Sequence, residues 1–347
     1  MTGAHAELHA ELRAVARDLL AKDAVDWPLL VRAGWVGLEA PESSGGAGAG
    51  FAEVAVLLDE IGRAAAACPH LGGAVLSVAA LNALRPSASR DELLTAIVAG
   101  EIRTAVALPT EIDPTPRYRF DGETVSGRAD FVPDAVGADE LLLAATAPEG
   151  GVVLIRAPAA AVDVRAEPVA DETRSLATVL AEDVAVGTAG VWAFADDGWA
   201  ALIDRARLAV ACDSLGLAEA MLAATVSYAQ VRHQFGRAIG SFQAVKHACA
   251  DMLVAVTVGR RLVADAVEAV AAGNPDATTK VLMAKAHACG SAVEVVGKAV
   301  QLHGGIGYTW ESGLHVYLKR AALNRSLFGS PAAHRAQLAQ RYENWRR

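Results

Sequence analysis

The stretch Val231-Arg-His-Gln-Phe-Gly-Arg-Ala-Ile-Gly-Ser-Phe-Gln-Ala-Val-Lys-His247 decides how this chain folds, because it separates two long helical patterns. Apolar residues recur every three or four positions in 208–226, and they do so again in 242–256. Within 235–241 this period stops and two glycines follow one another closely. We therefore expect two helices joined by a tight turn.

The ends of these two helices offer groups that suit an anionic ligand. Arg232 closes the first helix, and Gln243 opens the second, where backbone N–H groups have no partner within the helix. A guanidinium and free N–H groups beside a glycine turn can hold a phosphate. The alternative is an ordinary helix hairpin with a surface arginine, and this stretch alone does not decide between the two.

Composition and charge exclude several classes of protein. The chain has 347 residues, of which 53% are hydrophobic and 20% are charged, so we expect a globular protein with a large core. Its net charge of −9 argues against nucleic acid or an anionic membrane as a partner. No apolar run reaches the length of a membrane span, and residues 1–5 do not resemble the start of a signal peptide.

Cysteine and histidine usage predicts a cytoplasmic protein without a metal site. The four cysteines stand singly in apolar surroundings, so we expect reduced thiols in the core. They form no CxxC pair, and the nine histidines include no HExxH motif, so no metal ligands are predicted.

The chain changes its period twice, which predicts an α+β fold in three parts. Residues 1–98 have helical periodicity and form an N-terminal helical domain, whereas 99–192 alternate with period two and form a central antiparallel β domain. Residues 193–347 return to helical periodicity and form a C-terminal four-helix-type bundle. The predicted strands are 104–108, 124–128, 140–144, 151–156 and 177–181, and the main predicted helices are 11–20, 27–33, 51–63, 199–232, 242–272, 276–303 and 314–327.

Three stretches resemble the FAD-dependent acyl-CoA dehydrogenases, and the α–β–α order agrees with that family over nearly the whole chain. The first is Arg232-His-Gln-Phe-Gly236 with Phe242-Gln243, and the second is Gln301-Leu-His-Gly-Gly-Ile-Gly-Tyr308. The third, Pro41-Glu-Ser-Ser-Gly-Gly46 after Gly34-Trp-Val-Gly-Leu38, is similar to an entry loop of the family's first helical domain. Within the wider family, the match is to the degenerate subunits of actinobacterial heteromeric enzymes.

The resemblance implies α,β-dehydrogenation of an acyl-CoA thioester, with FAD as cofactor and an electron-transfer flavoprotein as electron acceptor. It also implies a tetramer in which the hairpin of one subunit contacts the FAD of its neighbour. Arg232 and Gln234 would then bind the pyrophosphate region, and Phe235 would pack near the flavin end. The remaining cofactor contacts implied by the resemblance are Gln243, Gln301, Gly304 and Gly305.

The chain departs from the family at the catalytic base. The turn that carries the family's usual Glu contains Phe328 here, and a phenyl ring accepts no proton. The alternative base position of some members, 26 residues before the motif arginine, is Ala206. Asp213 lies seven residues further on the same helix and nearly on the same face. It is a displaced base, a residue that shapes the acyl pocket, or an acid satisfied inside the bundle or at a subunit interface. No catalytic residue is therefore assigned.

A second departure lies in the β domain. Residues 109–113 lack the Gly-Ser-Asp of the family's flavin-binding loop, and the Trp-Ile-Thr segment is replaced by Phe131-Val132-Pro133. Because proline has no N–H, one backbone donor to the flavin is lost. The chain thus matches the half of the family's site that embraces a neighbour's FAD better than the half that holds its own.

Three hypotheses follow from these departures. In the first, the chain is one subunit of an acyl-CoA dehydrogenase heterotetramer, and its partner supplies the base and most flavin contacts. In the second, it is a self-sufficient homo-oligomeric enzyme with a displaced base such as Asp213. In the third, it is a catalytically dead scaffold or binding subunit on the same fold.

Overall fold

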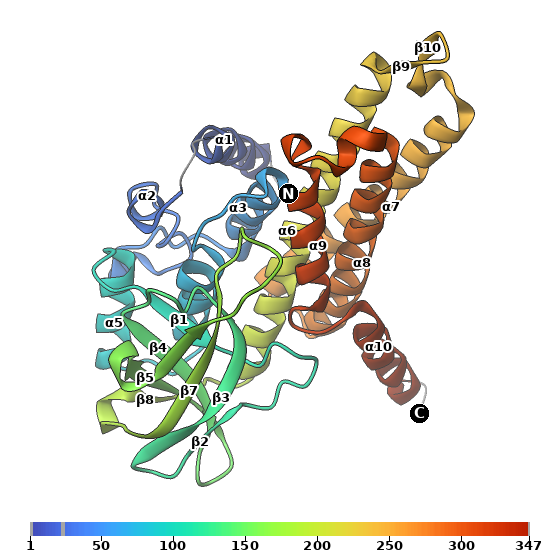
Figure 1. The fold of residues 1–347 in the computed structure, drawn as a ribbon. Coiled ribbons are helices and arrows are strands. Elements are labelled where there is room, and N and C mark those ends of the chain that lie inside the picture. Colours follow the sequence, from blue (N-terminus) through green and yellow to red (C-terminus); the bar gives the residue numbers. More distant parts are fainter. Residues whose placement is uncertain (1–2, 22–24, 346–347) are drawn as a thin grey trace. The chain divides into compact units, whose positions relative to one another are not determined.

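A computed structural model describes residues 3–21 and 25–345 of this chain, and they fall into two compact units (Figure 1). The sheet unit consists of residues 24–54 and 67–206. The bundle unit consists of residues 1–23, 55–66 and 207–347. Along the chain, helices come first, strands follow and helices return, which confirms the predicted fold class.

The strands of the sheet unit pair into one sheet with the order β6-β7-β3-β2-β4-β5-β8, and β1 pairs with β4. Their bounds are β1 Thr104–Ala107, β2 Tyr118–Phe120, β3 Thr124–Pro133, β4 Glu140–Thr146, β5 Val152–Pro158, β6 Asp163–Ala166, β7 Leu176–Ala185 and β8 Val191–Ala193. All five predicted strands are present, whereas β2, β6 and β8 were not predicted. These three strands have only three or four residues, too few to show a period of two.

The sheet is mixed, and this corrects the expectation of a purely antiparallel one. β1 and β2 both run parallel to β4, while the other pairs are antiparallel. The reason is the connection: β2 turns into β3 through a short hairpin, and the chain then returns to place β4 beside β2 in the same direction. A parallel neighbour requires such a long return, which hairpin-length gaps in the sequence do not reveal.

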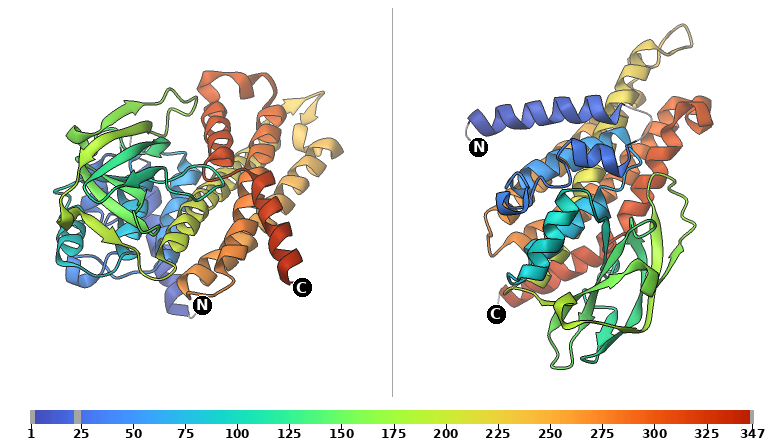
Figure 2. Two further views of the ribbon diagram at one scale, coloured as in Figure 1. Left: turned by 90° about the horizontal axis from the view of Figure 1, so that it is seen from below. Right: turned by 90° about the vertical axis from the view of Figure 1, so that its left-hand side faces the viewer.

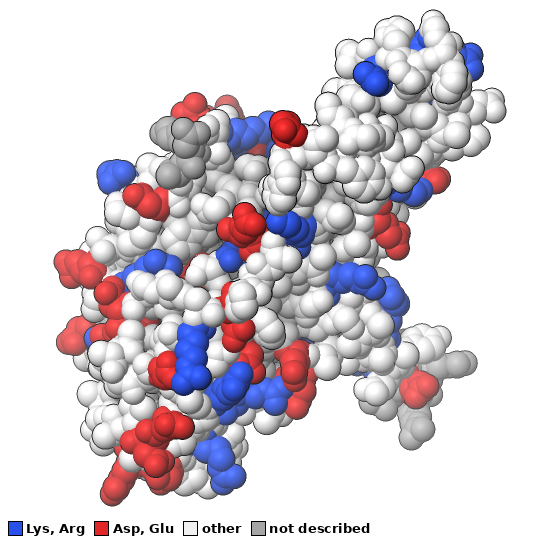
Figure 3. Space-filling view, viewed as in Figure 1, with Lys and Arg blue, Asp and Glu red and all other residues white. Residues whose placement is uncertain are grey.

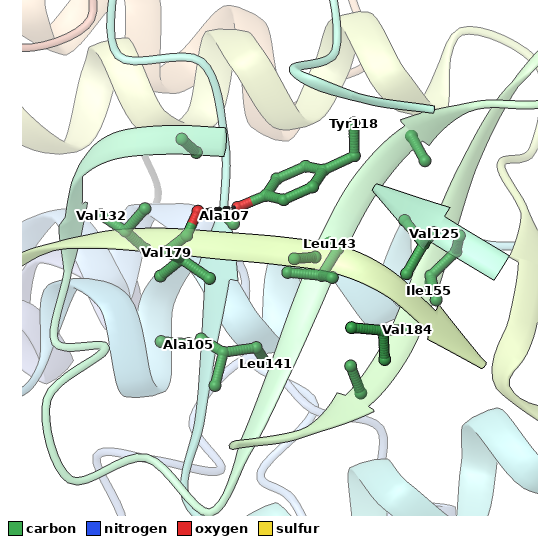
Figure 4. Close-up of a cluster of buried hydrophobic side chains, with 14 of the residues drawn as sticks. Ala105, Ala107, Tyr118, Val125, Val132, Leu141, Leu143, Ile155, Val179 and Val184 are labelled. Carbon is green, nitrogen blue, oxygen red and sulfur yellow. Dashed lines mark hydrogen bonds between the residues drawn. The ribbon is translucent and has the colours of Figure 1, made fainter. Parts of the chain in front are cut away.

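One hydrophobic cluster forms the core of this sheet (Figure 4). Tyr118 is fully buried there, and its hydroxyl donates to the carbonyl oxygen of Val179 at 2.8 Å. A buried tyrosine needs this partner, because an unsatisfied hydroxyl in an apolar core is costly. The small and branched side chains around it include Ala105, Val125, Val132, Leu141, Leu143, Ile155 and Val184.

Short helices complete the sheet unit: α2 Trp27–Arg32, α4 Ser77–Asn82, α5 Ala88–Val98, the 3-10 turn η1 Glu42–Ser44 and the π-helix η2 Leu71–Leu76. Asp26 and Ser87 accept backbone N–H groups at the starts of α2 and α5. The buried carboxylate of Asp134 accepts the N–H of Gly72 at 2.7 Å and so satisfies the start of η2.

Long helices make up the bundle unit, and the sequence predicted their ends closely except for the start of α1, which lies eight residues before the predicted one. They are α1 Gly3–Leu20, α7 Gln243–Ala271, α8 Ala277–His303, α9 Leu314–Ser326 and α10 Pro331–Trp345, together with most of α6 Gly198–Val231 and most of α3 Phe51–Ala64. The helices α6, α7, α8 and α9 lie alongside one another (Figures 1 and 2). Turn residues in the sequence mark their limits, which explains the agreement.

Glycines let α3 and α6 approach backbone to backbone within the bundle unit. A Cβ atom added at Gly62 would lie 2.0 Å from the carbonyl oxygen of Asp213, and one at Gly216 would lie 2.0 Å from that of Asp59. No side chain fits at either position. The crossing of α3 and α6 therefore depends on these two glycines. Asp59 and Asp213 both lie at this crossing.

Helix α6 is long and apolar enough to cross a membrane by length and composition, contrary to the expectation from the sequence. Its most apolar window has a mean hydropathy of 1.5, but 72% of that window is buried in the structure. A core helix of a globular protein passes the same test. The burial of α6 accounts for its composition, so it gives only weak evidence of a membrane span.

Candidate functional site

The turn predicted within Val231–His247 is a small hairpin between α6 and α7 (Figures 1 and 2). Strands β9 (His233–Gln234) and β10 (Arg237–Ala238) pair antiparallel, and Gly236 between them has φ +78°. The N–H of Ile239 donates to the carbonyl oxygen of Arg232 at 2.8 Å, which closes the base of the hairpin. The ends of the two helices are thus held in one fixed turn.

Phe235 stands at the tip of this hairpin in an unfavourable state. Its φ is +53°, in the left-handed region that bulky residues avoid, and 92% of its surface is exposed. Its only ring contact within the described residues is an edge-on approach to Phe242, with centroids 6.1 Å apart. Holding a phenylalanine in the left-handed region costs about 1–3 kcal/mol, and burial within this chain offsets almost none of it.

A ring stack joins the base of the hairpin to the glycine segment after α8. Tyr228, one helical turn before Arg232, stacks on His303 with ring centroids 4.3 Å apart. Its hydroxyl also donates to the carbonyl oxygen of His303 at 3.3 Å. Because His303 directly precedes Gly304, this contact places two of the three stretches that resemble the family at neighbouring positions of the bundle unit.

The glycine segment forms the 3-10 turn η6 (Gly304–Tyr308), and its glycines differ in what they require. Gly304 has φ +63° and ψ −142°, a conformation open essentially to glycine alone. Gly305 has no positive φ, and a Cβ atom added there would meet no atom within 4 Å. The fold of this chain therefore explains the glycine at 304, whereas it gives no reason for the one at 305.

The residues predicted to contact a cofactor share one property: each is exposed to solvent in the single chain. They are Arg232, Gln234, Phe235, Gln243, Gln301, Gly304 and Gly305. The first four lie on the hairpin and the start of α7, and the last three lie at the end of α8 and in η6. Their roles toward a cofactor stay predictions.

The turn that would carry the family's usual base is closed to solvent at Phe328. Phe328 is 1% exposed, has φ +59° and sits between α9 and α10. The fully buried Lys285 of α8 holds this turn, because its ammonium donates to the carbonyl oxygens of Asn324 at 2.8 Å and Gly329 at 3.3 Å. Burial lowers the pKa of Lys285. No proton acceptor occupies the position of Phe328.

Asp213 is enclosed in an ion pair within the bundle unit. Its carboxylate accepts from Arg320 at 2.5 and 3.1 Å and from the side-chain amide of Asn324 at 2.6 Å. Arg320 also donates to the carbonyl oxygen of Ala66 at 2.8 Å, and both charged side chains are about 1% exposed. This arrangement favours a structural role for Asp213, the alternative left open by the sequence.

The segment 131–133, where the sequence departs from the family, lies at the end of β3. Pro133 ends β3, and Phe131 has φ +57° at an irregularity in the register with β7. Residues 109–113 form no strand, and Thr110 is tied to β3 through the carbonyl oxygen of Asp130 at 3.1 Å. The backbone at Phe131 is thus bent away from regular pairing, and the strand offers no N–H at Pro133.

The structure also reveals a partly buried carboxylate that the sequence did not single out. Glu39 accepts from Arg205 at 2.6 Å, and the guanidinium of Arg205 lies 4.0 Å above the ring of Phe51. Burial raises the pKa of Glu39, while Arg205 partly counteracts the shift. One of its oxygens has no hydrogen-bond partner, and Arg205 directly precedes Ala206. Glu39 and Arg205 are 166 residues apart in the sequence, so no local pattern predicts their contact.

Two domain families match this chain. "Acyl-CoA dehydrogenase, N-terminal domain" matches residues 3–101, and "Acyl-CoA dehydrogenase, C-terminal domain" matches residues 196–343. Acyl-CoA dehydrogenase IpdE2 of Mycobacterium tuberculosis is 34% identical over 308 residues, which cover 88% of this chain and 82% of that protein. The chain belongs to the acyl-CoA dehydrogenase family. Members of this family are oxidoreductases that bind FAD.

Solved structures of related acyl-CoA dehydrogenases include two-chain assemblies. The "Tcur3481-Tcur3483 steroid ACAD G363A variant" superposes with a TM-score of 0.86 at 29% identity and covers 96% of this chain and 97% of its own. The "ChsE4-ChsE5 complex" of Mycobacterium tuberculosis gives 0.85 at 25% identity, covering 99% and 98%. Similar relatives of this acyl-CoA dehydrogenase family member are therefore found in heteromeric complexes.

Proposed function

We propose that this chain is one subunit of a heteromeric acyl-CoA dehydrogenase. It contacts the FAD that its partner subunit binds, and it supplies no catalytic base of its own. The substrate is an acyl-CoA thioester, and the electrons pass to an electron-transfer flavoprotein. FAD, when bound, supplies the hydride-accepting chemistry. The chain contributes position and charge through Arg232, Gln234, Phe235 and Gln243, and through the segment Gln301–Gly305.

The observation that carries this proposal is the state of the hairpin tip. Phe235 combines a left-handed backbone with 92% exposure, and burial against residues 3–21 and 25–345 offsets almost none of the cost. A ligand or subunit that covers the ring would offset it. Arg232, three residues before Phe235 in the sequence, has the planar fork that suits a diphosphate, and Gly305 leaves open space beside the backbone of η6. These residues fit a dinucleotide that arrives from outside the chain.

The residues at the family's two base positions support a division of labour between subunits. Abstraction of the α-proton requires a carboxylate within reach of the substrate. Phe328 and Ala206 are both buried apolar residues, and Asp213 is occupied by Arg320. A partner with an intact base would complete the site, as the two-chain assemblies of the similar proteins suggest.

An apolar stripe on α7 offers a surface for that partner. Leu253, Val254 and Val258 recur at intervals of one and four on the helix and are 55%, 64% and 42% exposed. They continue from the helix end that carries Gln243. Exposed apolar side chains grouped along one helix mark a contact surface more often than a free one. The stripe therefore supports a subunit contact on the same helix that begins at Gln243.

Glu39 favours a second candidate, a self-sufficient acyl-CoA dehydrogenase with a displaced base. Its carboxyl group has a raised pKa and an oxygen without a partner, which are features of proton-accepting groups. Its pairing with Arg205 counts against it, because the guanidinium favours the ionised form. Under this candidate, Glu39→Gln abolishes exchange of the substrate α-proton by the homo-oligomer. Under the proposed function, Glu39→Gln leaves the exchange rate of the heteromeric enzyme unchanged.

A pair of glycine variants tests the proposed function. We expect Gly305→Ala to fold normally, because a methyl group there meets no atom of the chain, but to lower FAD retention of the assembled protein by about tenfold. Gly297→Ala on α8 is the matched control, since a Cβ atom there also meets nothing within 4 Å. Equal flavin-to-protein ratios for both variants and the wild type would contradict the proposal.

A further inference from the structure

The hairpin carries a second arginine that the resemblance to the family did not single out. The guanidinium of Arg237 lies 4.1 Å above the centre of the Phe242 ring, and Phe242 in turn meets the edge of Phe235. Arg237 also pairs directly with Gln234 across β9 and β10. Because directly opposite residues of an antiparallel pair point to the same side, the side chains of Arg237 and Gln234 share one face of the hairpin.

The surroundings of Arg237 are basic within an acidic protein. The chain has a net charge of −9, yet no Asp or Glu lies between Glu219 and Asp251. Figure 3 shows only basic colour at the hairpin tip, at the upper right. Within the described residues neither Arg232 nor Arg237 has a carboxylate partner, whereas Arg260 and Arg261 on α7 each pair with an acid. The hairpin is therefore a local cationic site without an internal counter-charge.

We infer that Arg237 is a second anion-binding side chain, which clamps the diphosphate of the dinucleotide together with Arg232. This inference rests on the proposed function and adds a ligand contact to it. A guanidinium that stacks on an aromatic ring keeps its N–H donors in its own plane, so it can stack and donate to phosphate oxygens at once. Phe242 is then a positioning residue, because its ring holds Arg237 on the face that Gln234 shares.

The competing explanation is that Arg237 only stabilises the hairpin. In that case its charge has no role toward the ligand, and removing the arginine has the same effect as removing the ring beneath it. Salt separates these explanations, because an exposed contact between charges is screened and a stacking contact is not.

The experiment measures FAD affinity by fluorescence quenching in the assembled, flavin-stripped protein at low and high sodium chloride. We expect Arg237→Gln to weaken binding of FAD by about tenfold at low salt and to flatten the salt dependence. Phe242→Leu, which keeps the charge, should weaken binding by about threefold and retain the salt dependence. Arg237→Lys should restore part of the affinity, because it keeps the charge. Arg261→Gln on α7 controls for loss of a surface charge outside the hairpin.

The outcomes distinguish failure of the Arg237 contact from failure of the proposed function. If Arg232→Gln weakens FAD binding while Arg237→Gln does not, the second contact is wrong and the proposed function stands. If neither arginine variant changes FAD binding, both are wrong. If Arg237→Gln and Phe242→Leu give equal losses with unchanged salt dependence, Arg237 acts only on hairpin stability and the inference is overturned.

Discussion

Two phenylalanines of the bundle unit share an unfavourable backbone but differ in everything around it. Phe328 has φ +59° and is 1% exposed, whereas Phe235 has φ +53° and is 92% exposed. Burying a phenylalanine contributes about 1.5–3 kcal/mol, which offsets the strain at Phe328. Phe235 has no such gain from the part of the chain that the structure describes. Packing within the chain accounts for Phe328, whereas the proposed function accounts for Phe235 through a ligand or a partner that covers its ring.

The arginines near these two positions differ in the same way. Arg320 is buried and gives its donors to Asp213 and Ala66, so the fold uses it fully. Arg232 and Arg237 are exposed on the hairpin and have no acidic partner within the described residues. Arg320, whose donors are used within the fold, contributes to stability. Arg232 and Arg237, whose guanidinium groups are exposed on the hairpin, are suited to bind a ligand.

The largest expected effect comes from breaking the buried pair. Asp213→Asn leaves the charge of Arg320 buried without a counter-ion, so we expect the free energy of unfolding to fall by about 3–5 kcal/mol. The control is Asp251→Asn, which removes the acid of an exposed pair with Lys298 and should cost less than about 1 kcal/mol. Urea denaturation measures both. A loss below 1 kcal/mol for Asp213→Asn would show that the fold does not depend on this pair.

Truncating each phenylalanine sharpens the comparison directly. Phe328→Ala should lower the free energy of unfolding by about 3–5 kcal/mol, because it opens a cavity in the core. Phe235→Ala should change it by less than about 0.5 kcal/mol, because the ring packs on almost nothing in its own chain. Phe235→Ala should instead reduce FAD retention in the assembled protein. Thermal denaturation and flavin content measured on the same samples check both, and a stable, flavin-poor Phe328→Ala variant would reverse our assignment.

A smaller effect concerns a partly buried acid near the crossing of α3 and α6. Burial and the neighbouring Glu219 raise the pKa of Asp59 to about 7, although Arg63 acts against the shift. The folded state thus holds this proton more tightly than the unfolded state, in which the pKa is near 3.8. The stability that this group contributes is complete below about pH 4 and is lost as the pH rises to about 7.

Asp59→Asn should therefore remove a pH-dependent contribution. Between pH 5 and 8 we expect the wild type to lose about 3 kcal/mol more of its free energy of unfolding than the variant. Denaturation curves at both pH values test this, and Asp251→Asn provides the exposed control. Equal pH dependence in Asp59→Asn and the wild type would mean that the Asp59 carboxyl group is not protonated in the folded protein.

The sequence predicted the long helices of the bundle well, because glycine, proline and the change of period mark their ends. The predicted end of α6 near Arg232 and the start of α7 near Gln243 differ from the structure by one residue or less. The fold class followed from the two changes of period. The short strand β2 and the parallel pairing of β4 could not be predicted from the sequence. Neither the length of a strand nor its period indicates which other strand lies beside it.

The partners of the buried charged side chains could not be predicted from the sequence either. The partner of Asp213 is Arg320, 107 residues away, and the carbonyl partners of Lys285 lie 39 and 44 residues away. Such contacts depend on helix packing and leave no local pattern. The hairpin residues were easier to identify, because they lie together in a short stretch whose spacing resembles the family, and their roles still await measurement.

The most direct test of this account is the flavin absorption spectrum of the chain purified alone and together with its partner subunit. We predict little absorbance near the flavin bands and negligible oxidation of acyl-CoA for the chain alone, with stoichiometric FAD and activity in the complex. Stoichiometric FAD and full acyl-CoA turnover by the chain alone would contradict it.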